Sequence, residues 1–187
     1  IGSDKILVRK SLAGEEITTL DEIKREMSGN ELLITNGKKP IAVAGVMGGL
    51  NSAVTKDTTA VVIESAYFDP PTIRKGAKAL NMSTDASKRF ERGTDIKATE
   101  SAFWMIVEML KKYAEAKWVP GIVDEYPKTF KDVKIKVNKS KIASVSGVDI
   151  DNGFIEKSLT NIGCSIELDN DAWICNPPSW RPDISRE

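Results

Sequence analysis

The sequence predicts an α+β fold in which mixed or antiparallel β-sheets pack with helices, followed by a small winged-helix-like module. Three observations support this prediction. Short apolar runs separated by glycine and asparagine breakers fill residues 5–63, which is typical of strands. Helices bounded by capping residues follow between residues 69 and 115. The order strand, helix, helix and two-stranded hairpin over residues 133–178 indicates the winged-helix-like module.

The first part of the chain contains four predicted strands, "KILVRKS", "GEEITTL", "ELLIT" and "KPIAVAG", with "SGN" and "NGKK" as breakers. Between them, "LDEIKREM" predicts one or two helical turns. The run "VVIESAYF", residues 61–68, has the pattern of a strand that is buried on both faces, and Glu64 lies on one of them. A lone buried carboxylate is costly without a partner, so we expect the partner of Glu64 to lie outside the chain.

Capping residues predict three helices in the middle of the chain. Asp69, followed by two prolines, predicts a helix that runs to about Leu80. The stretch "STDASKRFERG" predicts a second short helix that begins at capping residues and ends at Gly93. Asp95 caps the longest predicted helix, over residues 96–115, where apolar residues recur at helical spacing.

The domain organisation is predicted from composition. We expect a domain over residues 1–118, a linker over residues 119–133 that contains prolines and a glycine, and a module over residues 134–187. The module contains strand "VKIKV", helices "SKIASVSG" and "NGFIEKSLTNIG", and hairpin "CSIELDNDAWICNPP". The chain begins at Ile1 and ends without completing an element, so we expect a piece truncated at both ends.

Composition excludes several function classes. Lys plus Arg (27) balances Asp plus Glu (27), so no overall positive field attracts nucleic acid or membranes, and any nucleic-acid contact has to be local. There is no apolar run of about 18 residues and no signal-peptide pattern, which predicts a soluble, cytoplasmic protein without a membrane partner. The chain has no histidine, the usual general base and commonest metal ligand, so we predict no metal site and no conventional catalytic nucleophile.

The two cysteines, Cys164 and Cys175, lack any CxxC spacing. This favours two small buried hydrophobic residues over a zinc site or a disulfide scaffold. A hairpin that turns at Asp169 and Asn170 would place the two sulfur atoms on facing strands, so an oxidation product stays open as an alternative.

A glycine-rich loop is the first candidate site. The stretch "AVAGVMGGLNS" places Gly45, Gly48 and Gly49 directly after an apolar strand. Glycines there permit positive φ and let a ligand approach bare amides, which can hold an anion or a carbonyl oxygen. The spacing matches neither the phosphate loop nor the dinucleotide pattern. A tight turn with close strand packing is the alternative.

The start of the second predicted helix is the second candidate site. Thr84 offers a hydroxyl beside free helix amides, although capping alone would also explain it. Lys88, Arg89 and Arg92 in "KRFERG" form a small basic patch that can contact the phosphates of RNA, or equally be a solvated helix face.

Residues 45–95, with the glycine loop, the glutamate run and the "RFERG" helix in that order, resemble the editing domain of the beta subunit of bacterial phenylalanyl-tRNA synthetase. The segment from about residue 134 to "NPPSWRPDI" resembles the winged-helix-like module that follows it. The resemblance implies an aminoacyl-tRNA ligase whose alpha subunit joins phenylalanine to tRNA(Phe) with ATP and Mg²⁺. It also implies that this domain hydrolyses misattached tyrosine, in an assembly of two alpha and two beta chains.

The resemblance also implies roles for individual residues. Gly45 and Gly48 would shape the site and position water and the oxyanion, Glu64 would accept the tyrosine hydroxyl, and Thr84 and Ala86 would line the wall. No cofactor is expected on this chain itself. The alternatives are a non-catalytic scaffold for the alpha subunit and tRNA, and a free-standing relative that binds another RNA. We expect the isolated piece to be a monomer.

Overall fold

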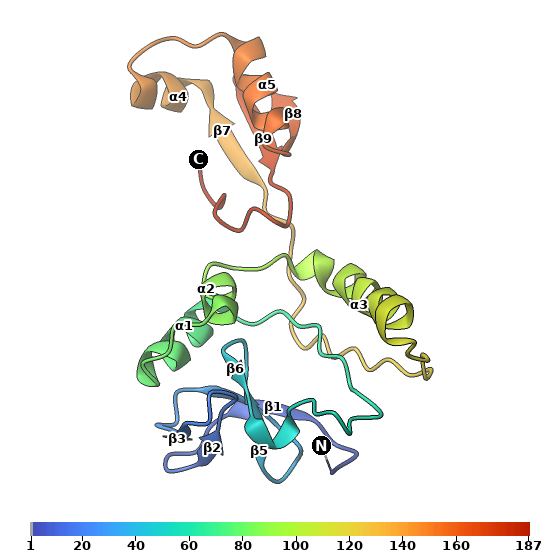
Figure 1. Cartoon of the computed structure of the whole chain (residues 1–187). Coiled ribbons are helices and arrows are strands. Elements are labelled where there is room, and N and C mark those ends of the chain that lie inside the picture. Colours follow the sequence, from blue (N-terminus) through green and yellow to red (C-terminus); the bar gives the residue numbers. More distant parts are fainter. Residues whose placement is uncertain (1) are drawn as a thin grey trace. The chain divides into compact units, whose positions relative to one another are not determined.

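The computed structural model describes residues 2–187, and Figure 1 shows the course of the chain. The chain divides into two compact units, one ending at Thr94 and the other beginning at Asp95. The predicted α+β class is confirmed, since helices accompany sheets whose strand pairs are all antiparallel in the described residues. The domain limits and the winged-helix likeness stay predictions.

The first unit contains a four-stranded sheet with the order β1-β4-β5-β6 and a separate hairpin of β2 and β3. The strands are β1 (Leu7–Lys10), β2 (Glu16–Thr18), β3 (Lys24–Glu26), β4 (Leu32–Thr35), β5 (Pro40–Val43) and β6 (Met47–Gly48). The predicted helical turns in "LDEIKREM" are wrong. Arg25 lies opposite Ile17 in the β2–β3 ladder, so pairing with a neighbouring strand overrides the local helical pattern.

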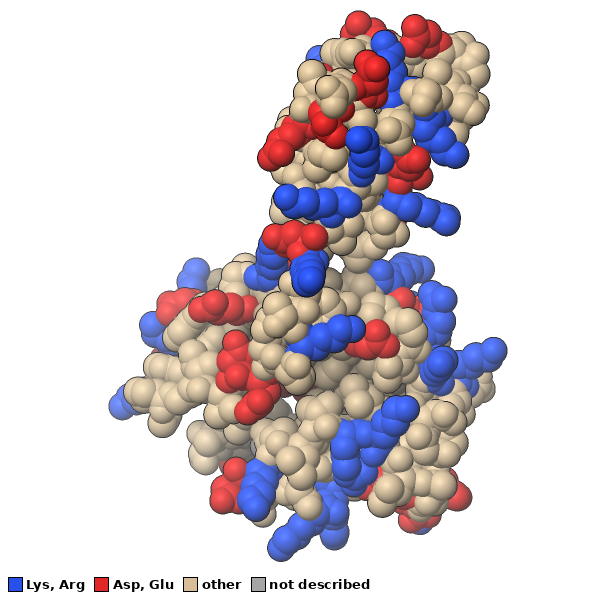
Figure 2. All heavy atoms as spheres, turned by 180° about the vertical axis from the view of Figure 1, so that it is seen from behind, with Lys and Arg blue, Asp and Glu red and all other residues tan. Residues whose placement is uncertain are grey.

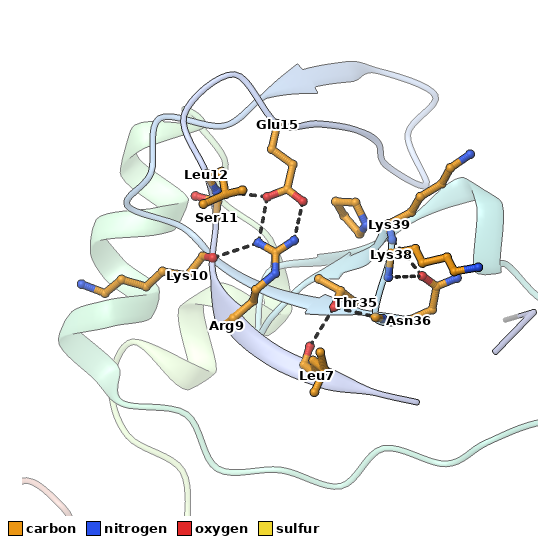
Figure 3. Close-up of polar contacts among 12 residues, drawn as sticks. Leu7, Arg9, Lys10, Ser11, Leu12, Glu15, Thr35, Asn36, Lys38 and Lys39 are labelled. Atoms are coloured by element: carbon orange, nitrogen blue, oxygen red, sulfur yellow. Dashed lines mark hydrogen bonds and ion pairs between the residues drawn. The ribbon is translucent and has the colours of Figure 1, made fainter. Parts of the chain in front are cut away.

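Polar contacts fix two of the connections that leave strands of this sheet (Figure 3). The predicted "NGKK" breaker is a turn in which the Asn36 side-chain oxygen accepts hydrogen bonds from the amides of Lys38 (3.1 Å) and Lys39 (2.8 Å). The Arg9 guanidinium donates to both oxygens of the Glu15 carboxylate, at 2.9 and 2.6 Å. This pairing ties β1 to the following loop, and it holds the pKa of Glu15 below its usual value.

Three helical segments complete the first unit: the 3₁₀ turn η1 (Leu50–Ser52), α1 (Pro70–Ala79) and α2 (Asp85–Phe90). The predicted cap is confirmed, because the Asp69 carboxylate accepts hydrogen bonds from the Thr72 amide (3.1 Å) and the Thr72 hydroxyl (2.6 Å). Helix α1 buries Ile73 and Ala77 against the apolar core of the unit, whose other members include Ile17, Met27, Leu33, Val43 and Phe68.

The predicted buried strand at residues 61–68 is wrong. Residues 53–69 contain no helix or strand, and Val61 and Val62 are exposed. A strand needs a neighbour for its backbone N–H and C=O groups, and none of the strands in residues 2–187 pairs with this segment. An alternating apolar pattern alone therefore does not produce a strand here.

The carboxylate that is buried in the first unit belongs to Glu31, which is 0% exposed. It accepts hydrogen bonds from the Ser11 hydroxyl (2.7 Å), the Ser28 amide (3.0 Å) and the Ser28 hydroxyl (2.8 Å). Burial alone raises the pKa of Glu31, but the hydrogen bonds outweigh burial and the net pKa is lowered. A Cβ atom on Gly76 would lie 3.4 Å from the Glu31 Cα, so α1 packs directly over this acid.

The second unit contains a three-stranded sheet with the order β7-β9-β8, together with helices. Its elements are η2 (Ile96–Ala98), α3 (Thr99–Ala114), β7 (Ile135–Asn138), α4 (Lys139–Ser146), α5 (Asn152–Asn161), β8 (Ser165–Asp169) and β9 (Ala172–Asn176). The predicted hairpin is confirmed, with Asn170 at φ 54° in its turn. Residues 115–134 contain no helix or strand.

Both cysteines are free and buried, as the sequence predicts. Cys164 comes directly before β8 and Cys175 lies in β9. Burial, together with a hydrogen bond to Cys164, raises the pKa of the Cys175 thiol to about 11. The thiolate, the reactive form of cysteine, is therefore disfavoured at neutral pH.

Replacing Glu31 by alanine should destabilise the first unit by about 3 kcal/mol, because the buried Ser11 hydroxyl and the two Ser28 donors lose their acceptor. At neutral pH, Glu31→Gln should lower the free energy of unfolding by less than Glu31→Ala does. The pKa of Glu31 is lowered in the folded state, so its charge stabilises the fold above the unfolded pKa of about 4.3. The difference between wild type and Glu31→Gln should therefore shrink as the pH falls below that value.

Urea unfolding followed by circular dichroism measures this effect. All tryptophans lie between residues 104 and 180, so their fluorescence monitors the second unit separately. Glu16→Ala, which removes an exposed acid paired with Lys24, is the matched control and should cost under about 1 kcal/mol. Equal losses for Glu31→Ala and Glu16→Ala would contradict a structural role for Glu31.

Candidate functional site

The glycine loop is a tight turn between β5 and β6. The Val46 amide donates to the Val43 carbonyl at 3.0 Å, and Gly45 has φ +64°, a conformation that favours glycine. A Cβ atom on Gly45 would lie 3.1 Å from Ile73 Cδ1 and 3.2 Å from Phe68 Cδ2. Gly45 is therefore required by both its backbone conformation and close packing, which is the alternative left open by the sequence.

The other two glycines of the loop differ from Gly45. Gly48 is half-buried beside Leu20, and its φ lies outside the positive region. Gly49 has the least room, because an added Cβ would lie 2.7 Å from the carbonyl oxygen of Ile41. Within the described residues, the Gly45 amide has no hydrogen-bond acceptor, so this N–H remains free to bind an oxygen atom of a ligand.

Thr84 connects the helix start to the glycine turn. Its hydroxyl donates to the Val46 carbonyl at 2.8 Å and accepts from the Ser87 amide at 3.0 Å. The Ser87 hydroxyl accepts in return from the Thr84 amide at 2.9 Å, which completes a capping box. The structure thus brings together two site segments that lie 38 residues apart, and half-buried Ala86 follows in the first turn of α2.

Glu64 differs from its prediction, because its side chain is exposed rather than buried. Among residues 2–187, no side chain or amide forms a hydrogen bond or ion pair with its carboxylate. Desolvation by the surrounding protein nevertheless raises its pKa above the ordinary glutamate value.

The position of Glu64 relative to the glycine turn is limited by Phe68. The Phe68 ring packs beside Gly45 and lies 5.2 Å from the ring of Phe90, measured between centroids. Glu64 precedes Phe68 by four residues, so their Cα atoms lie within about 14 Å of each other. Phe68 therefore tethers the Glu64 segment near the turn and α2, a connection that the sequence reading missed.

The predicted basic patch, Lys88, Arg89 and Arg92, is exposed at and just beyond the end of α2. None of the three forms an ion pair with another described residue. No group of three or more Cys, Asp or Glu side chains within residues 2–187 is arranged to hold a metal ion. No helix in the described part of the chain is long and apolar enough to span a membrane.

Comparisons with known proteins match the chain in two parts. The B3/4 domain family matches residues 1–115, and the tRNA synthetase B5 domain matches residues 135–187. Proteins named phenylalanine–tRNA ligase beta subunit are similar to this chain over all or nearly all of its length. The one from Salinibacter ruber is 43% identical over 187 residues, 100% of this chain and 22% of that protein. The one from Carboxydothermus hydrogenoformans is 38% identical over 100% of this chain and 23% of that protein. The one from Thermotoga maritima is 36% identical over 98% of this chain and 23% of that protein. The chain thus spans less than a quarter of these relatives.

Replacing Gly45 by alanine should destabilise the first unit by about 3 kcal/mol, because the new methyl group adds both backbone strain and crowding against Ile73 and Phe68. Gly14→Ala is the matched control in the same unit, since Gly14 has φ +79° and its nearest neighbour is 3.9 Å from the added Cβ. Backbone strain alone should destabilise the Gly14→Ala variant by about 1 kcal/mol. Equal values from urea unfolding would show that packing at Gly45 is unimportant.

Replacing Thr84 by valine should cost about 2 kcal/mol, because valine keeps the shape but leaves the Val46 carbonyl and the Ser87 amide without their partner. Thr84→Ser keeps the hydroxyl and should cost less than about 1 kcal/mol. Amide hydrogen exchange of residues 85–90 should accelerate in the valine variant alone. Similar exchange rates in both variants would refute the connecting role of this hydroxyl.

Proposed function

Because the chain belongs to the B3/4 domain family and its whole length is similar to part of phenylalanine–tRNA ligase beta subunits, we propose that it is a section of such a subunit and hydrolyses tyrosine misattached to tRNA(Phe). The single observation that carries this proposal is the Glu64 carboxylate, which has no protein partner among the described residues. A scaffold role would instead favour an acid paired with a protein donor.

Glu64 supplies the selectivity in this proposal. Tyrosine differs from phenylalanine by one hydroxyl, and an apolar pocket alone distinguishes the two poorly. A carboxylate that accepts the phenol O–H binds tyrosine, whereas phenylalanine leaves the acid without a partner. Desolvation, which raises the pKa of Glu64, also strengthens its hydrogen bond to a bound donor. The correctly charged product is therefore spared.

The glycine turn supplies the reaction centre. An aminoacyl ester is already activated, so a water molecule near its carbonyl carbon completes the hydrolysis. We assign the amides of Gly45 and Gly48 to positioning this water and stabilising the developing oxyanion, and the Gly45 amide supports this because it lacks an acceptor in the described chain. The reaction as proposed uses no cofactor of this chain.

Thr84 and Ala86 form the wall of the proposed pocket. Both hydrogen-bonding functions of the Thr84 hydroxyl are engaged by the protein, as donor to Val46 and acceptor from Ser87. Its methyl group and the Ala86 methyl group are the parts that remain to contact substrate. Thr84 therefore acts on the pocket through shape, and its polar atoms hold α2 in position.

The remaining parts of the proposal concern the whole enzyme. The alpha subunit joins phenylalanine to tRNA(Phe) with ATP and Mg²⁺ in the cytoplasm, and the beta subunit removes the mistaken product. A second candidate function is a non-catalytic scaffold for the alpha subunit and tRNA, or a free-standing RNA-binding relative. The exposure of Glu64, which was predicted to be buried, favours this second candidate.

Glu64→Ala, introduced into the assembled alpha–beta enzyme, separates the two functions. Hydrolysis of tyrosyl-tRNA(Phe) should fall by about tenfold to 100-fold, the value of a hydrogen bond to a charged group, and hydrolysis of phenylalanyl-tRNA(Phe) should stay low. Because the pKa of Glu64 is raised, protonation should weaken tyrosine selectivity at a higher pH than for an ordinary glutamate. Deacylation rates measured across pH report both effects.

Glu100→Ala is the control, because Glu100 is an exposed acid on α3 without an ion pair in the described residues. It should leave both rates unchanged. If Glu64→Ala behaves like this control, the chain is a scaffold and the editing proposal is wrong.

A further inference from the structure

Two helices of the first unit carry the same spacing of basic residues. In α1 the pattern is Arg74, Lys75 and Lys78; in the second group Lys88 and Arg89 lie in α2, and Arg92 lies in the turn just beyond its end. The sequence analysis identified only the second group. Positions i, i+1 and i+4 of a helix lie on one side, so the α1 group forms one basic stripe. We call the second group, which continues from α2 into the following turn, the second stripe.

The stripe on α1 points away from the core. Ile73, Gly76 and Ala77 are the buried residues of this helix, and Arg74, Lys75 and Lys78 are all exposed. The helical repeat of about 100° per residue places the basic stripe on the side opposite to the buried one. The apolar side thus attaches α1 to the core and the basic side faces solvent.

The stripe on α2 has the same arrangement. Ser87 is the buried residue of this short helix, and Lys88, Arg89 and Arg92 are exposed. The Met82 amide donates to the Ala77 carbonyl at 2.8 Å and closes the end of α1, and a connection of only five residues leads from there to α2. We call the two stripes together the basic face; its members are Arg74, Lys75, Lys78, Lys88, Arg89 and Arg92.

The basic face contrasts with the rest of the chain. Residues 70–92 contain six basic and two acidic side chains, whereas the whole chain has a net charge of zero. None of the six basic side chains forms an ion pair with another described residue. Figure 2 shows Lys and Arg atoms on several parts of the surface, the flank where α1 and α2 lie among them. An unpaired local excess of positive charge attracts a polyanion.

A second basic stretch, residues 128–141, contains six lysines and one acid. Lys136 pairs with Asp169 at 3.0 Å, and the acid, Asp132, pairs at 2.6 Å with Lys97, which lies outside the stretch. The basic face is distinguished from this stretch by its position, because Thr84, at the start of α2, is hydrogen-bonded to the glycine turn. The basic face therefore adjoins the elements that form the candidate site.

We propose that the basic face binds the sugar–phosphate backbone of RNA close to the glycine turn. This inference rests on the proposed function, since it names the surface that holds the tRNA whose ester is hydrolysed. Arg and Lys side chains on two helices contact phosphates without reading bases, so the surface supplies affinity and orientation and carries no sequence preference. Selectivity for the amino acid remains with Glu64.

Binding of uncharged, dye-labelled tRNA(Phe) to the 187-residue chain, followed by fluorescence anisotropy, tests the proposal. Two triple variants each remove one stripe: Arg74→Gln, Lys75→Gln and Lys78→Gln in α1, and Lys88→Gln, Arg89→Gln and Arg92→Gln in α2. Each should weaken binding about tenfold at low salt. The slope of log Kd against log salt should fall by about 2 to 3, near one unit for each lost phosphate contact.

The matched control removes three exposed lysines of the same unit, Lys5→Gln, Lys38→Gln and Lys39→Gln, and so changes the net charge equally. It should leave affinity within about twofold of wild type, since general charge effects are weak beyond the contact surface. Lys75→Arg, Lys78→Arg and Lys88→Arg together should bind RNA normally. Circular dichroism melts check that each variant is folded.

Three results would overturn the proposal: no tRNA binding by the wild-type chain, an equal loss in the lysine control, or unchanged binding in both triple variants. Binding to anionic phosphatidylserine vesicles that is lost in the triple variants, without tRNA binding, would instead assign the face to membranes.

The test separates this inference from the editing proposal, because uncharged tRNA undergoes no hydrolysis. Glu64→Ala should bind it normally. Conversely, the triple variants should raise KM for tyrosyl-tRNA(Phe) and leave hydrolysis of tyrosyl-adenosine, which lacks phosphates, unchanged.

Discussion

The hydrogen bond from the Thr84 hydroxyl to the Val46 carbonyl holds the candidate site together. It joins the start of α2 to the turn between β5 and β6, two segments that fold separately along the chain. A threonine suits this position because its hydroxyl donates in one direction and accepts from the Ser87 amide in the other. One side chain thus caps a helix and docks it on a turn.

Packing around Gly45 completes this junction. The missing side chain at Gly45 lets Ile73 of α1 and Phe68 approach the turn, and Phe68 in turn contacts Phe90 of α2. On the same buried side of α1, Gly76 lies directly over the buried Glu31. A Cβ on Gly45 would be crowded by Ile73 and Phe68, and a Cβ on Gly76 would be in van der Waals contact with Glu31, so α1 packs closely on both the turn and this hydrogen-bonded acid. In the proposed function this packing holds the amides of the turn in place, and amides stabilise developing charge only when they are already oriented.

Local signals in the sequence predict the parts of this arrangement that depend on neighbours along the chain. The Asp69 cap, the Asn36 turn and the hairpin turn at Asn170 are each determined by a few adjacent residues, and each was predicted correctly. Glu31 and Glu64 show the limit of such reasoning. Both are acids next to apolar runs, yet Glu31 is buried and bonded to Ser28, three residues before it, and to Ser11, twenty residues before it, whereas Glu64 is exposed. Their environments depend on which strands find partners, and residues 61–68 find none in the described chain.

The separation of charge in the first unit fits a division of tasks between two surfaces. Phosphates are identical in every tRNA, so a basic face gives affinity for a class of molecules and no information about the attached amino acid. Tyrosine and phenylalanine differ by a single phenol hydroxyl, and a hydrogen-bond acceptor placed at this hydroxyl distinguishes them. If the same groups performed both tasks, tighter RNA binding would also retain the correctly charged product. Because phosphate contacts bind both products equally, they raise the occupancy of the site without altering the choice between them. In the proposed function, selectivity then depends on the free energy of one hydrogen bond at Glu64, which an ion pair with a neighbouring lysine or arginine would reduce.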